Sequence, residues 1–457
     1  MSRVFLLSTN TIIEPYPVYP LGMAVVASAL SSRGHRVKQF DLLTEKGSRD
    51  RLGNAIRSFN PDVVGVSIRN IDNVDSFTAE EAWTLTSVKA LIEVIRSVTG
   101  APVVLGGPAF SIMPEEILAY VGGDYGIVGE GGVLLNSLIS RLERGEVAPA
   151  ILRNGEAALG GDMGFRPLWD KKLIEHYTKN NGVIGLHTKR GCPHSCIYCT
   201  YPAVEGVSYR RREPESVMED ILRLEKDHNI TSIFFTDSVF NDDEGYYLEI
   251  VEEMLRREIH IEWSAFFQPR GMGGKDLRLL KHSGLSAVEA GTDAASDTTL
   301  RGLNKSFGFD DVVHFNDACI EEEIPCVHYV MFGGPGETPD TIGEGLDNMA
   351  AMKNCAVLAF SGIRIYPGAA LYALSIEEGV IREEDPLMEP VFYFSPEVDA
   401  AAMNETLEKA FRGHRDRIFP PSSFQAKLEV MSRFGHRGNP WKALASFHKP
   451  RPGRLRS

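Results

Sequence analysis

The segment Lys189-Arg190-Gly191-Cys192-Pro193-His194-Ser195-Cys196-Ile197-Tyr198-Cys199-Thr200 is the most informative stretch of the chain. It places three cysteines in a C-x3-C-x2-C pattern, and the next cysteine is Cys319. Thiolates are soft ligands that suit iron–sulfur clusters, zinc or copper(I), and a four-iron cluster ordinarily takes four cysteines. Three ligands therefore predict a cluster with one iron open to another molecule. A zinc knuckle is the alternative, although His194 is poorly placed as its fourth ligand.

The cysteine run, with the aromatic Tyr198 directly before its last cysteine, resembles the signature of radical S-adenosylmethionine (SAM) enzymes. The resemblance implies that Cys192, Cys196 and Cys199 bind a [4Fe–4S] cluster and that Tyr198 lies near the cofactors. It also implies that the open iron chelates SAM. An electron from the cluster would then cleave SAM to methionine and a 5'-deoxyadenosyl radical, and an electron donor such as flavodoxin or ferredoxin would be needed.

Composition limits the kinds of protein and partner that fit. The chain has 457 residues, enough for about three domains, and 43% of them are hydrophobic. A formal net charge of -14 argues against nucleic acid as a partner. No apolar run is long enough for a transmembrane helix, and the N-terminus does not resemble a signal peptide. Half of the six cysteines lie in one run, which does not suggest a disulfide framework, so a reducing cytoplasmic location is expected.

Residues 1–145 alternate strand-like and helical segments, which predicts an α/β domain with a doubly wound, Rossmann-like parallel sheet. The predicted strands are Val4–Ser8, Arg36–Leu43, Asp62–Ile68, Pro102–Gly107 and Tyr125–Gly131. The predicted helices are Leu21–Arg33, Ser48–Phe59, Thr78–Val98 and Val133–Arg144. Such sheets bind ligands outside the carboxyl ends of their strands.

The loops at that edge resemble those of the cobalamin-binding domain that precedes many radical SAM domains. The resemblance rests on Pro20-x-Gly22 and on the strand ends Val104–Pro108 and Ile127–Gly131. It implies cobalamin contacts by Tyr19, Gly22, Ser67, Arg69, Asn70, Gly106, Gly107, Gly129, Glu130 and Gly131. The alternative is a flavodoxin-like domain that only packs against its neighbour.

Histidine ligation of the cobalt is not expected. His35 is the sole histidine in residues 1–145, and its turn lies at the amino edge of the predicted sheet, opposite the ligand edge. Arg69 or Asn70 is placed where a lower ligand would otherwise sit, and arginine keeps its proton. We therefore predict base-off cobalamin.

Residues 146–182 are predicted to form a linker, and residues 183–374 a partial (β/α)6 radical SAM barrel. The predicted strands are Val183–Lys189, Ser232–Asp237, Ile261–Phe267, Ala287–Asp293, Pro325–Gly333 and Ala356–Tyr366. Helices are predicted at residues 214–228, 243–257, 274–282, 308–322 and 338–352. Functional groups of such barrels lie at the carboxyl ends of the strands, and the cysteine run directly follows the first strand.

The ends of the later strands supply candidate contacts to SAM. The family resemblance implies that Asp237 supports the SAM amino group, with a helix N-cap as its alternative role. Arg270 could pair with the SAM carboxylate, or be solvated at the surface. Thr292 and Asp293 stand where relatives carry a glutamate that contacts the SAM ribose. Gly333 begins a stretch similar to the family's Gly-x-Pro-Gly-Glu-Thr element.

Residues 375–457 show no strand alternation and are predicted to form a small helical cap over the barrel, with helices at Ala400–Arg412 and Ser422–Phe434. The basic C-terminus is expected to be solvated. The cysteines outside the run, Cys319, Cys326 and Cys355, are expected to be core thiols.

The combined resemblance implies a cobalamin-dependent radical SAM enzyme, most commonly one that methylates an unactivated carbon. One SAM would methylate the cobalamin and a second would yield the radical. Cyclisation, oxidation or rearrangement without methyl transfer is the alternative, and a cobalamin-binding sensor or scaffold is another. Methylthiotransferases are disfavoured because residues 1–145 contain no cysteine for a second cluster. The substrate is expected to be a small or lipid-like molecule.

Overall fold

The computed structural model describes residues 1–13, 15–153, 166–433 and 439–445. These residues fall into two compact units. Unit 1 comprises Met1–Val74, Thr78–Ile230 and Arg364–Val391, and unit 2 comprises Asp75–Phe77, Thr231–Ile363 and the described residues from Phe392 onward. The boundaries expected from the sequence, after residues 145, 182 and 374, stay predictions.

Unit 1 is built on a parallel sheet with the strand order β2-β1-β3-β4-β5-β6. The strands are β1 Arg3–Ser8, β2 Arg36–Asp41, β3 Val63–Ser67, β4 Val103–Gly106, β5 Tyr125–Val128 and β6 Ile151–Arg153. The predicted doubly wound sheet is confirmed. The order reverses between β1 and β3, because the chain passes from β1 to β2 on one side and then to β3 on the other. A ligand site at the carboxyl ends of β1 and β3 follows from this switch point.

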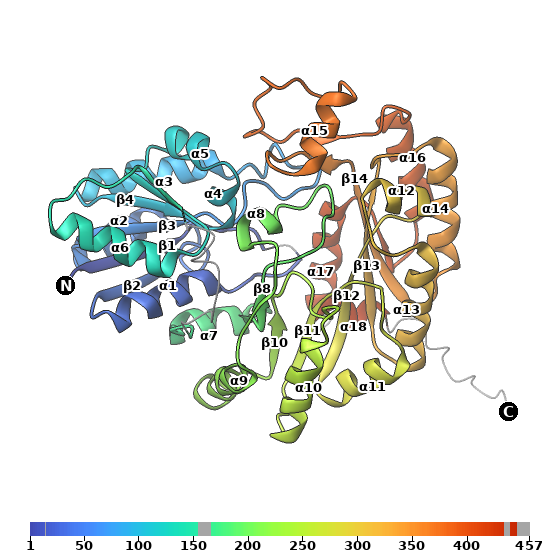
Figure 1. Cartoon of the computed structure of the whole chain (residues 1–457), viewed down its shortest axis with the longest axis horizontal. Coiled ribbons are helices and arrows are strands. Elements are labelled where there is room, and N and C mark those ends of the chain that lie inside the picture. The colour runs from blue at the N-terminus through green and yellow to red at the C-terminus, as the bar shows by residue number, and fades with distance from the viewer. Residues whose placement is uncertain (14, 154–165, 434–438, 446–457) are drawn as a thin grey trace. The chain divides into compact units, whose positions relative to one another are not determined.

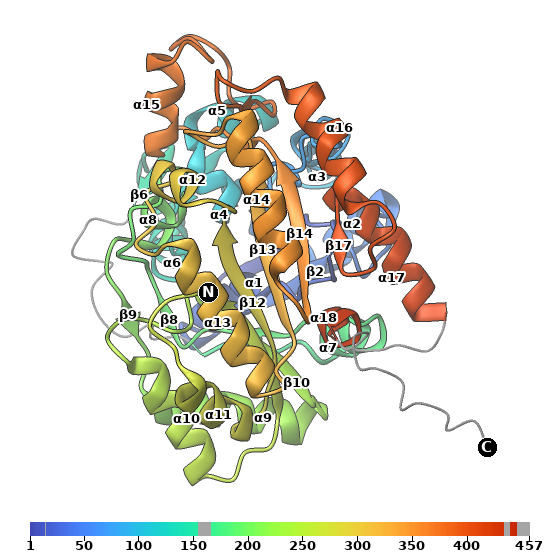
Figure 2. The same ribbon diagram turned by 90° about the vertical axis from the view of Figure 1, so that its right-hand side faces the viewer.

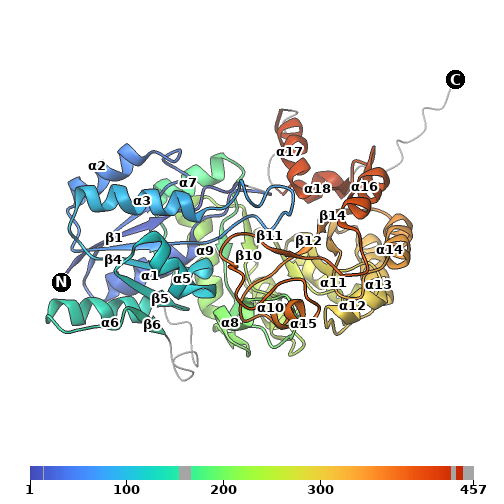
Figure 3. The same ribbon diagram turned by 90° about the horizontal axis from the view of Figure 1, so that it is seen from above.

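Helices cover both faces of the sheet of unit 1 (Figure 3). Helix α1 (Leu21–Ser32) packs with α6 (Gly131–Glu143), and α2 (Arg49–Phe59) packs with α3 (Leu85–Val98). Helix α3 begins seven positions later than predicted. The reason is tertiary: the backbone N–H of Thr84 donates to Ile71 O at 2.7 Å, and its hydroxyl donates to Asn70 O at 2.7 Å.

The sequence analysis missed several short elements of unit 1. Among them are α4 (Pro108–Ile112), α5 (Pro114–Val121), β6 and α7 (Lys171–Lys179). The last two lie in the segment predicted to be a linker. Helix α7 begins after Asp170, whose carboxylate accepts the backbone N–H groups of Lys172 and Leu173, an ordinary N-cap.

In unit 2 the strands run in the order β17-β14-β13-β12-β11-β10, all parallel. Figure 1 labels the strands from β10 to β14. They are β10 Ser232–Phe235, β11 Glu262–Phe267, β12 Leu285–Asp293, β13 Cys326–Phe332, β14 Cys355–Ser361 and β17 Arg417–Ile418. The main helices are α10 Tyr246–Arg256, α11 Gly274–His282, α13 Phe309–Glu321 and α14 Pro339–Ala351. Figure 2 shows α13 and α14 along one face of β12, β13 and β14. The predicted strand Ala356–Tyr366 ends early, where Gly362 takes φ +71°.

The two helices predicted in the C-terminal segment are confirmed, and the segment adds a short strand and a further helix that were not predicted. It forms α16 (Ala400–Phe411), the short strand β17, α17 (Phe424–Arg433) and α18 (Pro440–Ala445). Trp441 of α18 is fully buried, stacks on Phe424 at 4.8 Å between ring centroids, and meets Tyr329 edge-on at 6.0 Å. Tyr329 and His328 are neighbours on β13, so their side chains point to opposite faces of the sheet. Because His328 hydrogen-bonds to α13 and Tyr329 contacts α18, these two helices pack on opposite faces of the strands.

Among the described residues no helix is both long and apolar enough to cross a membrane.

Candidate functional site: the cysteine loop and the carboxyl edge of the sheet

The three clustered cysteines lie on a closed loop of unit 1. Its two ends are β8 (Lys189–Arg190) and β9 (Arg210–Arg211), which pair antiparallel, and it contains the short helix α8 (Tyr201–Glu205). Gly191 turns the chain into the loop with φ +84°, and a Cβ at this position would lie 2.0 Å from Ser208 O. A side chain is therefore excluded at the entrance to the loop.

The thiols of this loop suit the iron–sulfur cluster that the sequence predicts. Cys192 is buried, with 6% of its surface exposed, and Cys196 and Cys199 are half-buried. All six cysteines lie in the described part of the chain, and none forms a disulfide. The other three thiols are buried in unit 2, as expected for core residues. In the described ranges, no three His, Cys, Asp or Glu side chains are grouped for a single metal ion; a cluster would instead take each thiolate on a separate iron.

Backbone hydrogen bonds set the path of the loop. The N–H of Cys192 donates to Gly206 O at 3.1 Å, and that of Cys199 donates to Cys196 O at 3.1 Å. The N–H of Leu371, in α15 (Ala370–Glu377), donates to Ile197 O at 2.8 Å. The loop is thus fixed from within and by the later segment of unit 1.

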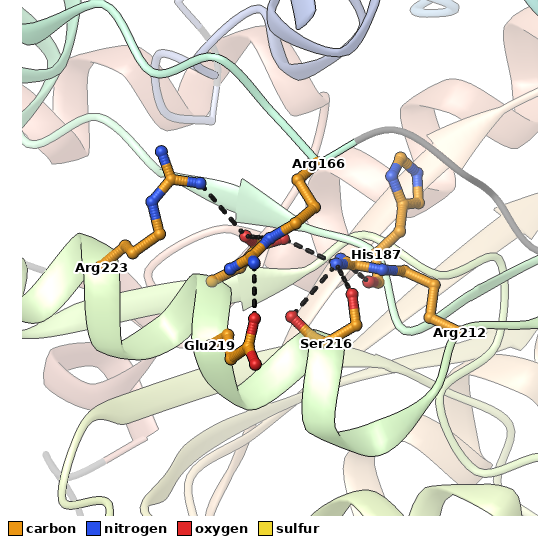
Figure 4. Close-up of polar contacts among 7 residues, drawn as sticks. Arg166, His187, Arg212, Ser216, Glu219 and Arg223 are labelled. Atoms are coloured by element: carbon orange, nitrogen blue, oxygen red, sulfur yellow. Dashed lines mark hydrogen bonds and ion pairs between the residues drawn. The ribbon is translucent and has the colours of Figure 1, made fainter. Parts of the chain in front are cut away.

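An arginine network that the sequence analysis missed holds the chain just before the loop (Figure 4). Asp220, fully buried in α9 (Pro214–His228), pairs with Arg166 at 2.9 Å and with Arg212 at 2.6 Å. Arg212 also donates from its backbone to Thr188 O and from its side chain to His187 O. The polar residues are dispersed in sequence and carry no motif, so only the structure reveals that α9 anchors this chain segment.

Glu130, predicted to contact cobalamin, is engaged in ion pairs. It directly precedes α6, and its carboxylate lies 3.3 Å from Arg190 and 2.5 Å from Arg210. Burial alone would raise the pKa of Glu130, but the two arginines outweigh burial and lower that pKa below its usual value. Glu130 is therefore ionised at neutral pH, and its contact with cobalamin stays a prediction.

Arg69 and Asn70 lie at the predicted place, just after β3 and beside the switch point. Arg69 keeps exposed surface, but the protein around its guanidinium desolvates it, and this desolvation lowers its pKa. Tyr201, Tyr16 and Tyr177 have the opposite, smaller effect on that pKa. Ser67 ends β3, and its carbonyl accepts the backbone N–H of Thr9 at 3.2 Å. The loops after β1 and β3 thus meet at the switch point.

The glycines of this edge divide into two groups. A Cβ at Gly107 would lie 2.5 Å from Ile68 O, and Gly107 takes φ +98°, so the local backbone alone requires glycine there. A Cβ at Gly22 would meet no atom within 4 Å. The protein itself therefore leaves open space beside Gly22, which is compatible with a bound molecule.

Of the remaining glycines, Gly131 is predicted to end the strand that begins at Tyr125, but β5 ends at Val128. Gly106 ends β4, Gly129 takes φ +82°, and Gly131 begins α6. Their contacts with cobalamin stay predictions.

Two further residues of unit 1, Tyr19 and His35, have contacts with other residues of the protein. Tyr19 is 1% exposed and packs its ring against Trp169 and Tyr177 at 5.4 and 5.7 Å. This packing accounts for Tyr19 by itself, and a cobalamin contact by it stays a prediction. His35 directly precedes β2, and so lies at the amino edge of the sheet, as expected. Its ring accepts the backbone N–H of Ser2 and forms a hydrogen bond with Asn136.

In unit 2 the predicted SAM residues occupy different environments. Asp237 follows β10 and is 1% exposed. It does not cap α10, since the carboxylate of Asp242 accepts the N–H groups of Tyr246 and Tyr247. Arg270 is exposed, which fits the solvated alternative as well as a ligand role.

The end of β12 carries the other two candidates. The hydroxyl of Thr292 bonds to the buried His328 at 2.7 Å, on the side of the sheet that faces α13. Asp293 takes φ +64° and forms an ion pair with Lys305. The contacts of Thr292 and Asp293 with SAM stay predictions. No motif in the sequence predicts that Lys305 pairs with Asp293.

Gly333 follows β13 with φ +88°, and its N–H donates to the buried Glu337 at 3.2 Å. Burial raises the pKa of Glu337, despite the hydrogen bonds from Thr341 and Gly333 that oppose it. The family-like turn is thus held by its own glutamate.

Known families match both parts of the chain. The B12 binding domain matches residues 14–139, and the Radical SAM superfamily matches residues 186–348. Tryptophan 2-C-methyltransferase from Streptomyces laurentii is 25% identical over 428 residues, covering 77% of this chain and 71% of the relative. Anaerobic magnesium-protoporphyrin IX monomethyl ester cyclase from Rubrivivax gelatinosus is 25% identical over 353 residues, covering 71% of this chain and 60% of the relative.

A solved structure shares the fold over nearly the whole chain. The radical SAM methyltransferase TsrM from Kitasatospora setae, with cobalamin and a [4Fe-4S] cluster bound, superposes with a TM-score of 0.83 at 24% identity, covering 97% of this chain and 98% of that one. From the two family matches, the cofactors of the present chain are cobalamin, SAM and a [4Fe–4S] cluster. Because the two family matches cover the doubly wound sheet and the cysteine loop in the order that the sequence predicts, the chain belongs to the radical SAM enzymes that carry a cobalamin-binding domain.

Proposed function

We propose that the protein transfers a methyl group to an unactivated carbon of a small molecule. The observation that carries this proposal is the likeness to tryptophan 2-C-methyltransferase over 77% of the chain, together with an intact cysteine triad, Cys192, Cys196 and Cys199. When bound, the cofactors supply the methyl group and the means of activating the carbon, which no protein side chain provides.

The chain's own residues position these groups and exclude competing reactions. The cysteine triad would hold the cluster on a loop that is closed by β8 and β9. The open space beside Gly22 would admit cobalamin at the switch point. Arg69 offers only N–H donors, so Arg69, or its neighbour Asn70, would hold cobalamin without supplying a ligand to the metal.

Asp237 and Arg270 would support the amino and carboxylate groups of SAM, and Asp293 would contact its ribose. An electron donor such as flavodoxin or ferredoxin would be required. A cytoplasmic location suits an oxygen-sensitive cluster. The domain order that fits this function is cobalamin-binding domain 1–145, linker 146–182, barrel 183–374 and C-terminal segment 375–457. The preference for a lipid-like substrate remains a prediction, since the named relatives act on chemically unlike molecules.

A cyclisation or rearrangement without methyl transfer is the second candidate, favoured by the match to the ester cyclase. One anaerobic assay separates the candidates. The reconstituted enzyme is given SAM with a deuterated methyl group, cobalamin, a low-potential reductant and a small-molecule extract of its source. A methylase should give S-adenosylhomocysteine, 5'-deoxyadenosine and a product bearing the deuterated methyl group. The second candidate gives 5'-deoxyadenosine without stoichiometric S-adenosylhomocysteine, and a scaffold gives neither, so either result would overturn the proposal.

A further inference from the structure

The two strands that close the cysteine loop place like charges opposite each other. β8 and β9 are two residues long, and in their antiparallel register Arg190 faces Arg210. Like charges directly opposite on neighbouring strands are destabilising. A ladder this short has few hydrogen bonds with which to offset that repulsion, so the closed loop needs an opposing charge.

Glu130 supplies that charge from a distant part of unit 1. Its carboxylate contacts both guanidinium groups, at 3.3 Å from Arg190 and 2.5 Å from Arg210. The side chains of Arg190, Arg210 and Glu130 are only 17%, 7% and 28% exposed, so solvent screens the contact weakly. Glu130 is ionised, because the arginines lower its pKa.

The position of Glu130 in the fold gives the ion pairs a second consequence. Glu130 lies between β5 and α6, in the Gly129–Gly131 turn at the carboxyl edge of the doubly wound sheet. Arg190 lies two residues before Cys192. We propose that Glu130 is a positioning residue that holds the cysteine loop closed and fixes it to the cobalamin-binding sheet. The proposal does not depend on which reaction the enzyme catalyses.

The charges of Glu130 and Arg190 should also change the reduction potential of the cluster. An electron added to the cluster is opposed by a nearby carboxylate and favoured by a nearby guanidinium. Glu130→Gln should therefore raise the reduction potential of the cluster, and Arg190→Gln should lower it. In the double variant the two charge changes cancel, and the potential should return close to that of the parent enzyme. A purely structural role for Glu130 would not produce opposite shifts that cancel.

The first test measures loop closure in the full-length chain before cluster insertion. Iodoacetamide labelling, read by peptide mass spectrometry, gives a rate for each cysteine of the triad, with the buried Cys319 as internal reference. We expect Glu130→Gln to increase the rates about tenfold, which corresponds to about 1.4 kcal/mol. The double variant Glu130→Gln/Arg190→Gln should return most of the way to the parent rate, because the repulsion that Glu130 offsets is then gone.

A matched control is Glu115→Gln, since Glu115 pairs with Arg153 on the surface of the same unit, where both side chains are at least half exposed. This variant should leave labelling rates and potential unchanged. The second test is a redox titration of the holoenzymes followed by electron paramagnetic resonance. Unchanged labelling in Glu130→Gln, or a double variant that labels as fast as Glu130→Gln, would overturn the proposal. If Glu130→Gln alone does not accumulate, the double variant must do so, and its failure would overturn the proposal as well.

Discussion

Replacing Asp72 by asparagine should loosen the segment Arg364–Val391 within unit 1. Asp72 follows β3, and its carboxylate lies 2.8 Å from the guanidinium of Arg364; the two side chains are 0% and 2% exposed. The other N–H groups of Arg364 donate to Ile365 O and Leu387 O, each at 2.8 Å. Arg364 therefore joins the later segment to the loop after β3, and Asp72 is the charge that balances it.

The size of the effect follows from this burial. Asparagine keeps the shape of the side chain and can still accept the N–H of Val74, as Asp72 does at 2.9 Å. It leaves the guanidinium without a counter-charge, however, and breaking a buried ion pair in this way costs about 3–5 kcal/mol. Since about 1.4 kcal/mol is a factor of ten, local protection should fall by roughly a hundredfold to several thousandfold.

Hydrogen exchange with mass spectrometry is the suitable assay, because a chain of two units does not give a single unfolding free energy. Peptides from Arg364–Val391 report the effect, and peptides from β13 serve as the reference. The control is Asp385→Asn in the same segment. Asp385 pairs with Arg382 at 2.8 Å, but the side chains are 28% and 74% exposed, and exposed pairs contribute about 0–1 kcal/mol. Equal losses of protection in the two variants would refute the reasoning.

Three further predictions concern the cofactors and unit 2. Alanine at any position of the cysteine triad should abolish cluster binding and reductive cleavage of SAM, whereas Cys355→Ala should keep its iron; retained cluster iron in a triple variant would disprove the assignment. Electron paramagnetic resonance of the Co(II) form should show no axial-nitrogen splitting, and a splitting that vanishes in His35→Ala would contradict base-off binding. Burial, reinforced by Arg417, lowers the pKa of His328 to about 3, below its unfolded value of about 6.5. As the pH falls below about 6.5, the unfolded state therefore takes up the proton first, and the stability of unit 2 should fall by up to about 1.4 kcal/mol per pH unit. Hydrogen exchange of β13 at pH 7 and pH 5, corrected for intrinsic rates, should show this loss in the parent protein and not in His328→Gln.

The sequence was most informative where structure depends on near neighbours. Runs such as Val4–Ser8 fold as strands because they are buried on both faces of a parallel sheet, and that burial is visible as an unbroken apolar run. The cysteine loop was equally clear, because the spacing of its ligands is local. The same reasoning missed β17, which has only two residues and no alternation to detect. It also misplaced the start of α3, where Thr84 bonds to the loop after β3 instead of extending the helix.

The residues around the candidate site were harder to assign, because a loop residue can serve either a ligand or the protein. Glu130 and Tyr19 lie in loops that resemble a cobalamin site, yet the structure gives each a protein partner. The partners of Glu130, Arg190 and Arg210, are 60 and 80 residues away in the sequence. The sequence around a charged loop residue does not indicate which distant charged residue it contacts, so the ion pairs of Glu130 could not be predicted.

Two carboxylates at the same edge of the sheet now have comparable roles. Glu130 follows β5 and reaches the arginines that close the cysteine loop, while Asp72 follows β3 and reaches Arg364. Leu371, in the segment that Arg364 anchors, donates its N–H to Ile197 O inside the cysteine loop. The edge at which cobalamin is predicted to bind therefore supports the cluster loop by two separate routes. It follows that a substitution among these loops can impair the cluster while cobalamin still binds, and that cluster content and cobalamin affinity must be measured separately before a loop residue is assigned to either cofactor.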